Sequence, residues 1–161
     1  MKFAAVLLSA ALSATLFAAC ATPAFAHTGK QYFACGAAQV RIDIIARDAL
    51  QWEDRVESVV TVSKDGYSTV LRYRNIDFIG GQCVAKPGAA PLVVFQAYCG
   101  GSGCKDLDNW GVIETDQLRV LTVPSDTNRE DARRIIGSDR LPQLDMLAVD
   151  IGPPARQSSS Q

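Results

Sequence analysis

The sequence is almost without histidine, and this scarcity limits the catalytic chemistry that it can support. Its only histidine is His27. Serine and cysteine nucleophiles usually need a nearby base, most often His, and no internal His can serve Ser102 or any cysteine. The segment "GGSGC" also lacks the Gly-x-Ser-x-Gly spacing of a nucleophile elbow, because Cys104 stands where the last glycine is needed. A serine or thiol enzyme is therefore not expected.

Metal-binding patterns are equally scarce. A copper site built on His27 would need a second histidine, and no cysteines stand in the close pairs typical of zinc sites. An EF-hand-like loop beginning at Asp106 would place Trp110 at position 5 and Gln117 at position 12, where oxygen ligands are required. We therefore expect neither a metal nor another cofactor.

No excess of positive charge is present. The chain has 16 basic and 17 acidic residues, for a formal net charge of −1. Proteins that bind nucleic acid usually carry a basic patch or stripe, so nucleic acid is not an expected partner.

The N-terminal segment 1–26 contains a single charge, Lys2, followed by an apolar run that ends at Ala24-Phe25-Ala26. This order is typical of a secretory signal peptide cleaved after Ala26. A membrane anchor is an alternative, although a cationic stop-transfer flank is missing. A second alternative is lipid attachment at Cys20, which follows two alanines as in a lipobox; apart from an anchor, only this attachment would tether the protein to a membrane.

Four of the five cysteines follow the predicted cleavage point. An even number in an exported chain indicates disulfides, and four cysteines allow three connectivities. We favour Cys99–Cys104, around a glycine-rich turn, and Cys35–Cys83. The predicted location is therefore the periplasm or the cell exterior.

Alternating apolar residues predict several short strands. The clearest pattern lies in "ESVVTVSKDGYSTVLRYRN", where Asp65-Gly66 separates two alternating runs and indicates a β-hairpin. The segment "LVVFQAYC", 92–99, is apolar on both faces and is expected to be central. Further strands are expected over 40–46, in "IDFIGGQCVA", and in the two runs "WGVIET" and "LRVLTV". The segment 27–39 is taken as a lead-in.

One helix is expected near the C-terminus, in "SDTNREDARRIIG". Thr127 and Glu130 have capping-box spacing, and Gly137 stands where a C-terminal cap belongs. The sequence therefore predicts a small, β-rich α+β domain over 27–151, with six or seven short strands in a sheet or barrel and one late α-helix. The alternative is an all-β barrel capped by the helix. The polar segment 152–161 is expected to be a disordered tail.

Two segments are candidates for contact with a partner, because Tyr, Trp and Arg dominate the hot spots of protein interfaces. The hairpin supplies Tyr67, Arg72, Tyr73 and Arg74, and the loop that follows the central strand supplies Asp106, Asp108 and Trp110.

These observations favour an exported, non-catalytic binding protein, such as an inhibitor or an envelope accessory factor, whose partner is a protein of the envelope or the exterior. One alternative is a glycan or peptide hydrolase that uses two carboxylates, which sequence alone cannot identify among 17 acids. The other is a structural protein of the envelope or surface.

Overall fold

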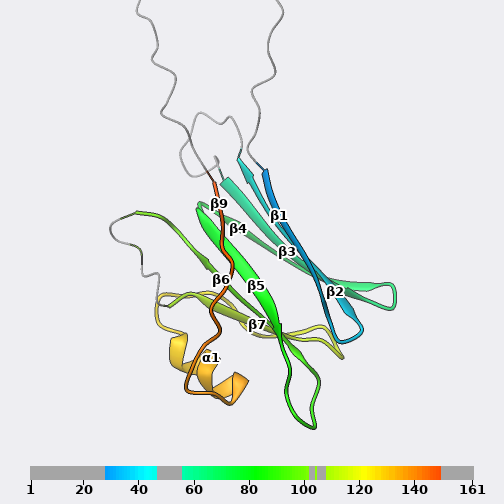
Figure 1. Cartoon of the computed structure of the whole chain (residues 1–161). Coiled ribbons are helices and arrows are strands. Elements are labelled where there is room, and N and C mark those ends of the chain that lie inside the picture. The colour runs from blue at the N-terminus through cyan, green and yellow to red at the C-terminus, as the bar shows by residue number, and fades with distance from the viewer. Residues whose placement is uncertain (1–27, 47–55, 102–103, 105–107, 150–161) are drawn as a thin grey trace, which may run out of the picture.

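The structure is a computed structural model that describes residues 28–46, 56–101, 104 and 108–149 (Figure 1). The predicted signal peptide and tail lie outside the described residues and stay predictions. In chain order the elements are β1 (Thr28–Cys35), β2 (Ala38–Ala46), β3 (Val56–Lys64), β4 (Tyr67–Arg74), β5 (Phe78–Val84), β6 (Leu92–Tyr98), β7 (Trp110–Glu114), β8 (Arg119–Thr122), α1 (Arg129–Ile136) and β9 (Leu147–Ala148).

The strands form two antiparallel sheets packed face to face. Sheet A has the order β1-β2-β3-β4, and sheet B has the order β8-β7-β6-β5-β9. The prediction of a β-rich domain with one late helix is confirmed at this level. The barrel alternative is wrong, because the two sheets keep separate edges rather than closing on each other. The described residues also contain nine strands, more than the six or seven expected.

The main core lies between the two sheets. Alternate residues of β2 point inward, among them Ile42, which is fully buried and lies opposite Val60 of β3. Sheet B contributes Phe95 and Ile113 from β6 and β7, both also fully buried. The central position predicted for β6 is confirmed, since it pairs with β5 on one side and β7 on the other.

The β3–β4 hairpin follows the prediction closely. Lys64 pairs with Tyr67, which leaves Asp65 and Gly66 as a two-residue loop. Their φ angles are 51° and 82°, the left-handed conformations that a type I′ turn requires at both positions. The turn sets the register of the hairpin, and with it the face to which each β4 side chain points.

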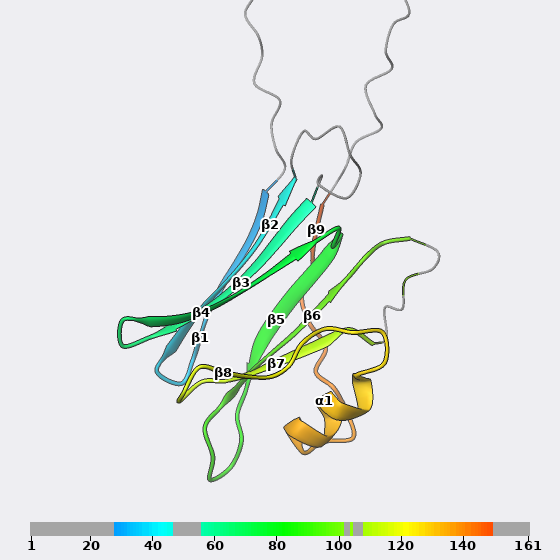
Figure 2. The same cartoon turned by 180° about the vertical axis from the view of Figure 1, so that it is seen from behind.

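A third layer packs on part of the outer face of sheet B, at β7 and β8. Trp110 and Val112 of β7 pack there with Ala132 and Ile136 of α1 in a second apolar cluster. Figure 2 shows α1 on this side of sheet B, away from sheet A. The helix ends as predicted, with Gly137 in the left-handed conformation and its N–H bonded to the Arg133 carbonyl.

Two local predictions are wrong. The segment taken as a lead-in is strand β1, because Gln31, Phe33 and Cys35 face inward opposite β2 while the residues between them face out. The expected capping box is also absent: the N-cap is Asn128, whose side chain bonds to Trp110 of β7 and Thr122 of β8 instead.

The cysteines pair as Cys35–Cys83, with a Cα–Cα distance of 5.0 Å, and Cys99–Cys104, at 5.7 Å. These are the pairs favoured from the sequence. Cys35 ends β1 of sheet A and Cys83 belongs to β5 of sheet B, so the first disulfide ties the two layers together. The second disulfide closes a short loop after β6. Two disulfides fit an oxidising compartment.

Candidate functional site

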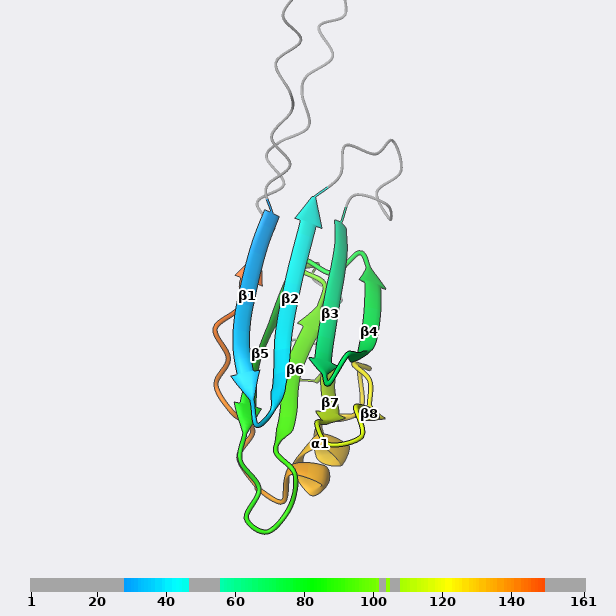
Figure 3. The ribbon, with the colours of Figure 1, turned by 90° about the vertical axis from the view of Figure 1, so that its right-hand side faces the viewer.

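The outer face of sheet A differs from that of sheet B because no described element lies over it (Figure 3). We call this surface the sheet A face. Its residues alternate with the core residues and stand side by side in cross-strand rows. The rows are Ala34, Gln39, Ser63 and Ser68; Tyr32, Arg41, Thr61 and Val70; Lys30, Asp43, Val59 and Arg72; and finally Ile45, Glu57 and Arg74.

The second of these rows carries exposed apolar surface. Tyr32 is 62% exposed and Val70 is 45% exposed, on opposite edges of the sheet. The Arg41 guanidinium lies 5.9 Å from the centre of the Tyr32 ring, within the range of a cation–π contact. This contact places an aromatic ring and a cation next to each other on the surface.

Asp43 is an acid at the centre of the sheet A face. Its Oδ2 accepts a hydrogen bond from Arg41 Nε at 2.7 Å, and this bond, with the charge of Asp43, raises the pKa of Arg41. Asp43 is only 4% exposed, and its Oδ1 has no hydrogen-bond partner. An unsatisfied buried acceptor costs about 1–3 kcal/mol, so folding stability alone does not favour this placement.

The face is positively charged overall. Arg72 forms an ion pair with Glu57 at 3.0 Å, and Arg74 lies opposite Glu57 in the sheet register. The face carries four cations and two carboxylates in all: Lys30, Arg41, Arg72 and Arg74 against Asp43 and Glu57. Its net charge of +2 contrasts with the −1 of the whole chain. Such an asymmetry of charge orients the approach of charged molecules to a protein.

The structure places the hairpin residues that were expected to bind a partner in different parts of the fold. Arg72 and Arg74 lie on the sheet A face, as their shared strand parity predicts. Tyr73 points into the sandwich, where its ring lies 6.2 Å from that of Phe95. Tyr67 stands at the hairpin tip and is 76% exposed. The four residues therefore do not form one site.

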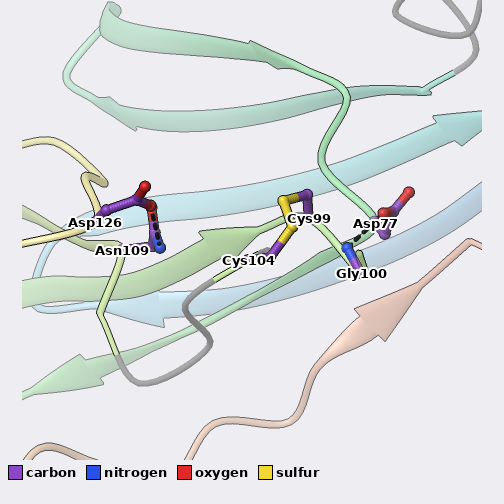
Figure 4. The surroundings of a disulfide bond; sticks show 6 residues. All are labelled: Asp77, Cys99, Gly100, Cys104, Asn109 and Asp126. Carbon is purple, nitrogen blue, oxygen red and sulfur yellow. Dashed lines mark hydrogen bonds between the residues drawn. A yellow bond between two sulfur atoms is a disulfide. The ribbon is translucent and has the colours of Figure 1, made fainter. Parts of the chain in front are cut away.

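The other candidate segment is a stapled turn. Gly100 N donates to Asp77 Oδ2 at 2.5 Å beside the Cys99–Cys104 disulfide, and Asn109 Nδ2 donates to Asp126 Oδ1 at 3.1 Å (Figure 4). These bonds hold both ends of the loop to neighbouring segments of the fold.

The acids and the tryptophan of this segment lie in different places. Asp106 is outside the described residues. Asp108 is half-buried, and its carbonyl accepts a bond from Gln96 Nε2 at 2.8 Å. The expectation that Trp110 faces a partner is wrong: it is 6% exposed, because the apolar cluster beneath α1 takes up its indole.

Sequence reasoning missed the contribution of β1 and β2 to the sheet A face. Tyr32, Arg41 and Asp43 were not among the predicted partner-binding residues. A signal was present, since Lys30 and Tyr32 alternate with inward residues of "GKQYFAC", but a cross-strand register is needed to bring them beside Arg41.

Among the described residues, no three His, Cys, Asp or Glu side chains are grouped so that they could hold a metal ion. No helix in the described part of the chain is long and apolar enough to cross a membrane. Comparison with protein-family models, with curated proteins and with solved structures finds no match to this chain.

Proposed function

We propose that this is an exported, non-catalytic binding protein that recognises a protein of the envelope or exterior through the sheet A face. One observation carries the proposal. The inner faces of the two sheets pack on each other, and α1 packs on the outer side of sheet B at β7 and β8, whereas no described element packs on the outer side of sheet A.

The composition of the face supports this role. Tyrosine and arginine are enriched in interface hot spots, and here Tyr32 and Arg41 are already in contact. Because the two side chains already contact each other, they lose less conformational entropy when a partner binds than two separate side chains would. The Oδ1 of Asp43, beside this pair, is buried without a hydrogen-bond partner. Such a group lowers folding stability, and proteins retain groups of this kind most often at functional sites.

The charge of the face favours a partner whose contact surface is acidic. Arg72 has an exposed guanidinium and a single described ion pair, to Glu57, so it can turn toward an acid of the partner while its stem still covers the sheet. A positive face on a chain of net negative charge also gives the approach a preferred orientation.

The experiment is capture of partners by the immobilised, oxidised protein from envelope and culture-medium fractions, repeated with single variants. Tyr32→Ala and Arg72→Ala should each weaken capture of one stoichiometric protein at least fivefold. Arg134→Ala is the matched control, because Arg134 is also an exposed arginine with one described ion pair, on α1. It should capture that protein as well as the wild type does.

Two results would overturn the proposal. One is a partner that the two face variants retain as strongly as the control does. The other is recovery of no partner together with turnover of a glycan or peptide panel, which would favour the carboxylate hydrolase.

A further inference from the structure

We propose that a pocket between two hairpin tips is a second, independent binding site and that its ligand is a sugar residue of a glycan. The cavity has a volume of about 270 Å³ and lies where the β3–β4 and β7–β8 tips meet. We call it the hairpin-tip pocket. It is lined by Lys64, Asp65, Tyr67, Asp116, Gln117 and Leu118. None of these residues belongs to the sheet A face.

The two tips are fastened to each other. Lys64 Nζ donates to the Asp116 carboxylate at 3.0 Å and to the Asp116 carbonyl at 3.3 Å. Close by, Thr69 Oγ1 donates to the Leu118 carbonyl at 2.7 Å. These bonds join residues 49–52 positions apart in the sequence, so the pocket depends on the folded sandwich.

Each tip is also fixed internally. Glu114 accepts bonds from the N–H groups of Asp116, at 2.6 Å, and Gln117, at 3.1 Å. Asp65 and Gly66 occupy the two left-handed positions of their turn. A pocket built from two constrained turns is preorganised, so little conformational entropy is lost when a ligand binds.

The chemistry of the lining suits a sugar. Tyr67 offers a ring that is 76% exposed, and the apolar C–H face of a pyranose can stack on such a ring. The Asp65 carboxylate and the Gln117 side-chain amide make no hydrogen bond or ion pair to any described residue. Together they present acceptors and donors at the pocket edge, and sugar hydroxyls act as both.

A basic side chain is the competing ligand, since it could contact Asp65 and the Tyr67 ring. The pocket already contains a cation, however, because Lys64 lines it with a side chain that is only 20% exposed. Lys64 pairs with Asp116, so Asp65 is the one unpaired charge of the lining. A sugar hydroxyl can donate to the Asp65 carboxylate without placing a second cation beside the Lys64 ammonium. The volume fits one sugar residue rather than a large ligand.

The test is titration of the ¹⁵N-labelled, oxidised protein with cellobiose, N,N′-diacetylchitobiose, lactose and maltose, followed by amide chemical shifts. We expect at least one disaccharide to shift amides within 64–69 and 114–118 in a saturable manner. Tyr67→Ala should weaken that binding at least tenfold, and Tyr67→Phe, which keeps the ring, should stay within about threefold of the wild type. Tyr32→Ala is the matched control, an exposed tyrosine on a different surface, and should bind as the wild type does.

The proposal is wrong if none of the four disaccharides shifts these amides. It is also wrong if Tyr67→Ala binds the sugar as tightly as Tyr32→Ala does. Saturable shifts with the peptide Gly-Arg-Gly-Gly in place of the sugars would assign the pocket to a basic side chain instead. Each of these outcomes leaves partner capture by the sheet A face unaffected.

Discussion

Tyr73 is a polar residue in an apolar position. It lies on the inner side of β4, opposite Ser58, and its hydroxyl is buried without a hydrogen-bond partner. Burial disfavours the phenolate and raises the pKa of Tyr73. The folded state therefore holds this proton to a higher pH than the unfolded chain, where the pKa of tyrosine is about 10.

This difference predicts a loss of stability at alkaline pH. The stabilisation by the neutral phenol is fully present below about pH 10 and falls as the pH rises above it, because the unfolded chain then releases the proton that the folded chain still holds. Tyr73→Phe has no proton to release, so its free energy of unfolding should fall less than that of the wild type between pH 9 and 11. At pH 7 the same change should add up to about 1 kcal/mol, since it removes an unsatisfied hydroxyl.

Urea unfolding at pH 7, 9 and 10.5 measures both effects. Tyr67→Phe is the control, since its ring is largely exposed, and it should follow the wild type at each pH. If the free energy of unfolding of Tyr73→Phe fell with pH as much as that of the wild type, the Tyr73 phenol would not be the cause of the alkaline loss of stability.

At the scale of single elements, the Asn128 side chain and backbone connect β7, the segment that follows β8, and α1. Its Oδ1 accepts a bond from Trp110 N at 2.9 Å, and its Nδ2 donates to the carbonyls of Trp110 and Val123. Its own carbonyl accepts the first helical bond, from Ala132 N at 3.0 Å. One buried amide thus fixes the start of β7, the end of β8 and the start of α1.

We expect Asn128→Ala to lower the free energy of unfolding by about 2–4 kcal/mol, because it removes the hydrogen bonds from the Asn128 side chain to the Trp110 backbone and to the Val123 carbonyl. Asn128→Asp keeps the acceptor and loses the donor, so it should also lower the free energy of unfolding. Thr127→Ala is the control: the structure gives Thr127 no capping role, and this variant should stay within about 0.5 kcal/mol of the wild type. Denaturant unfolding monitored by tryptophan fluorescence measures all three. If Thr127→Ala lowered the free energy of unfolding more than Asn128→Ala does, the result would contradict this prediction and favour a capping box at Thr127.

Local patterns in the sequence were enough to predict the elements whose identity is decided locally. The Asp65-Gly66 turn, the apolar run of β6 and the Gly137 cap need only neighbouring residues, and all three are confirmed. Strand β1 was missed because polar and apolar residues do not alternate along it: Gln31 faces inward, and Tyr32 and Ala34 face outward. Asn128 was missed because its bonds reach Trp110, which is 18 positions away.

The candidate site was predictable only in part for the same reason. Strand parity places Arg72 and Arg74 on one face, but which sheet face stays uncovered depends on where α1 packs. That choice buries Trp110, which short-range patterns suggested as a surface residue. The hairpin-tip pocket joins two turns that are distant in the sequence, and no local pattern of either turn specifies it.

At the scale of the whole molecule, the two disulfides differ in what they constrain. Cys35–Cys83 spans 48 positions and joins sheet A to sheet B, whereas Cys99–Cys104 spans 5 positions within one loop. Loop-closure entropy of the unfolded chain gives about 4 kcal/mol for the first and about 2 kcal/mol for the second. Together they are comparable to the total stability of a typical small domain, about 5–15 kcal/mol.

We therefore expect the double substitution of Cys35 and Cys83 by Ala to lower the free energy of unfolding by about 4 kcal/mol, and that of Cys99 and Cys104 by about 2 kcal/mol. The second pair is the control for the first, because both remove one disulfide and two sulfurs. Guanidinium unfolding without reductant measures the difference, and reduction of the wild type should reproduce the two losses combined. Reduction without effect on the unfolding midpoint would contradict the prediction. A large loss would make the folded state depend on an oxidising compartment, since the sandwich core alone would then leave the two sheets only marginally associated.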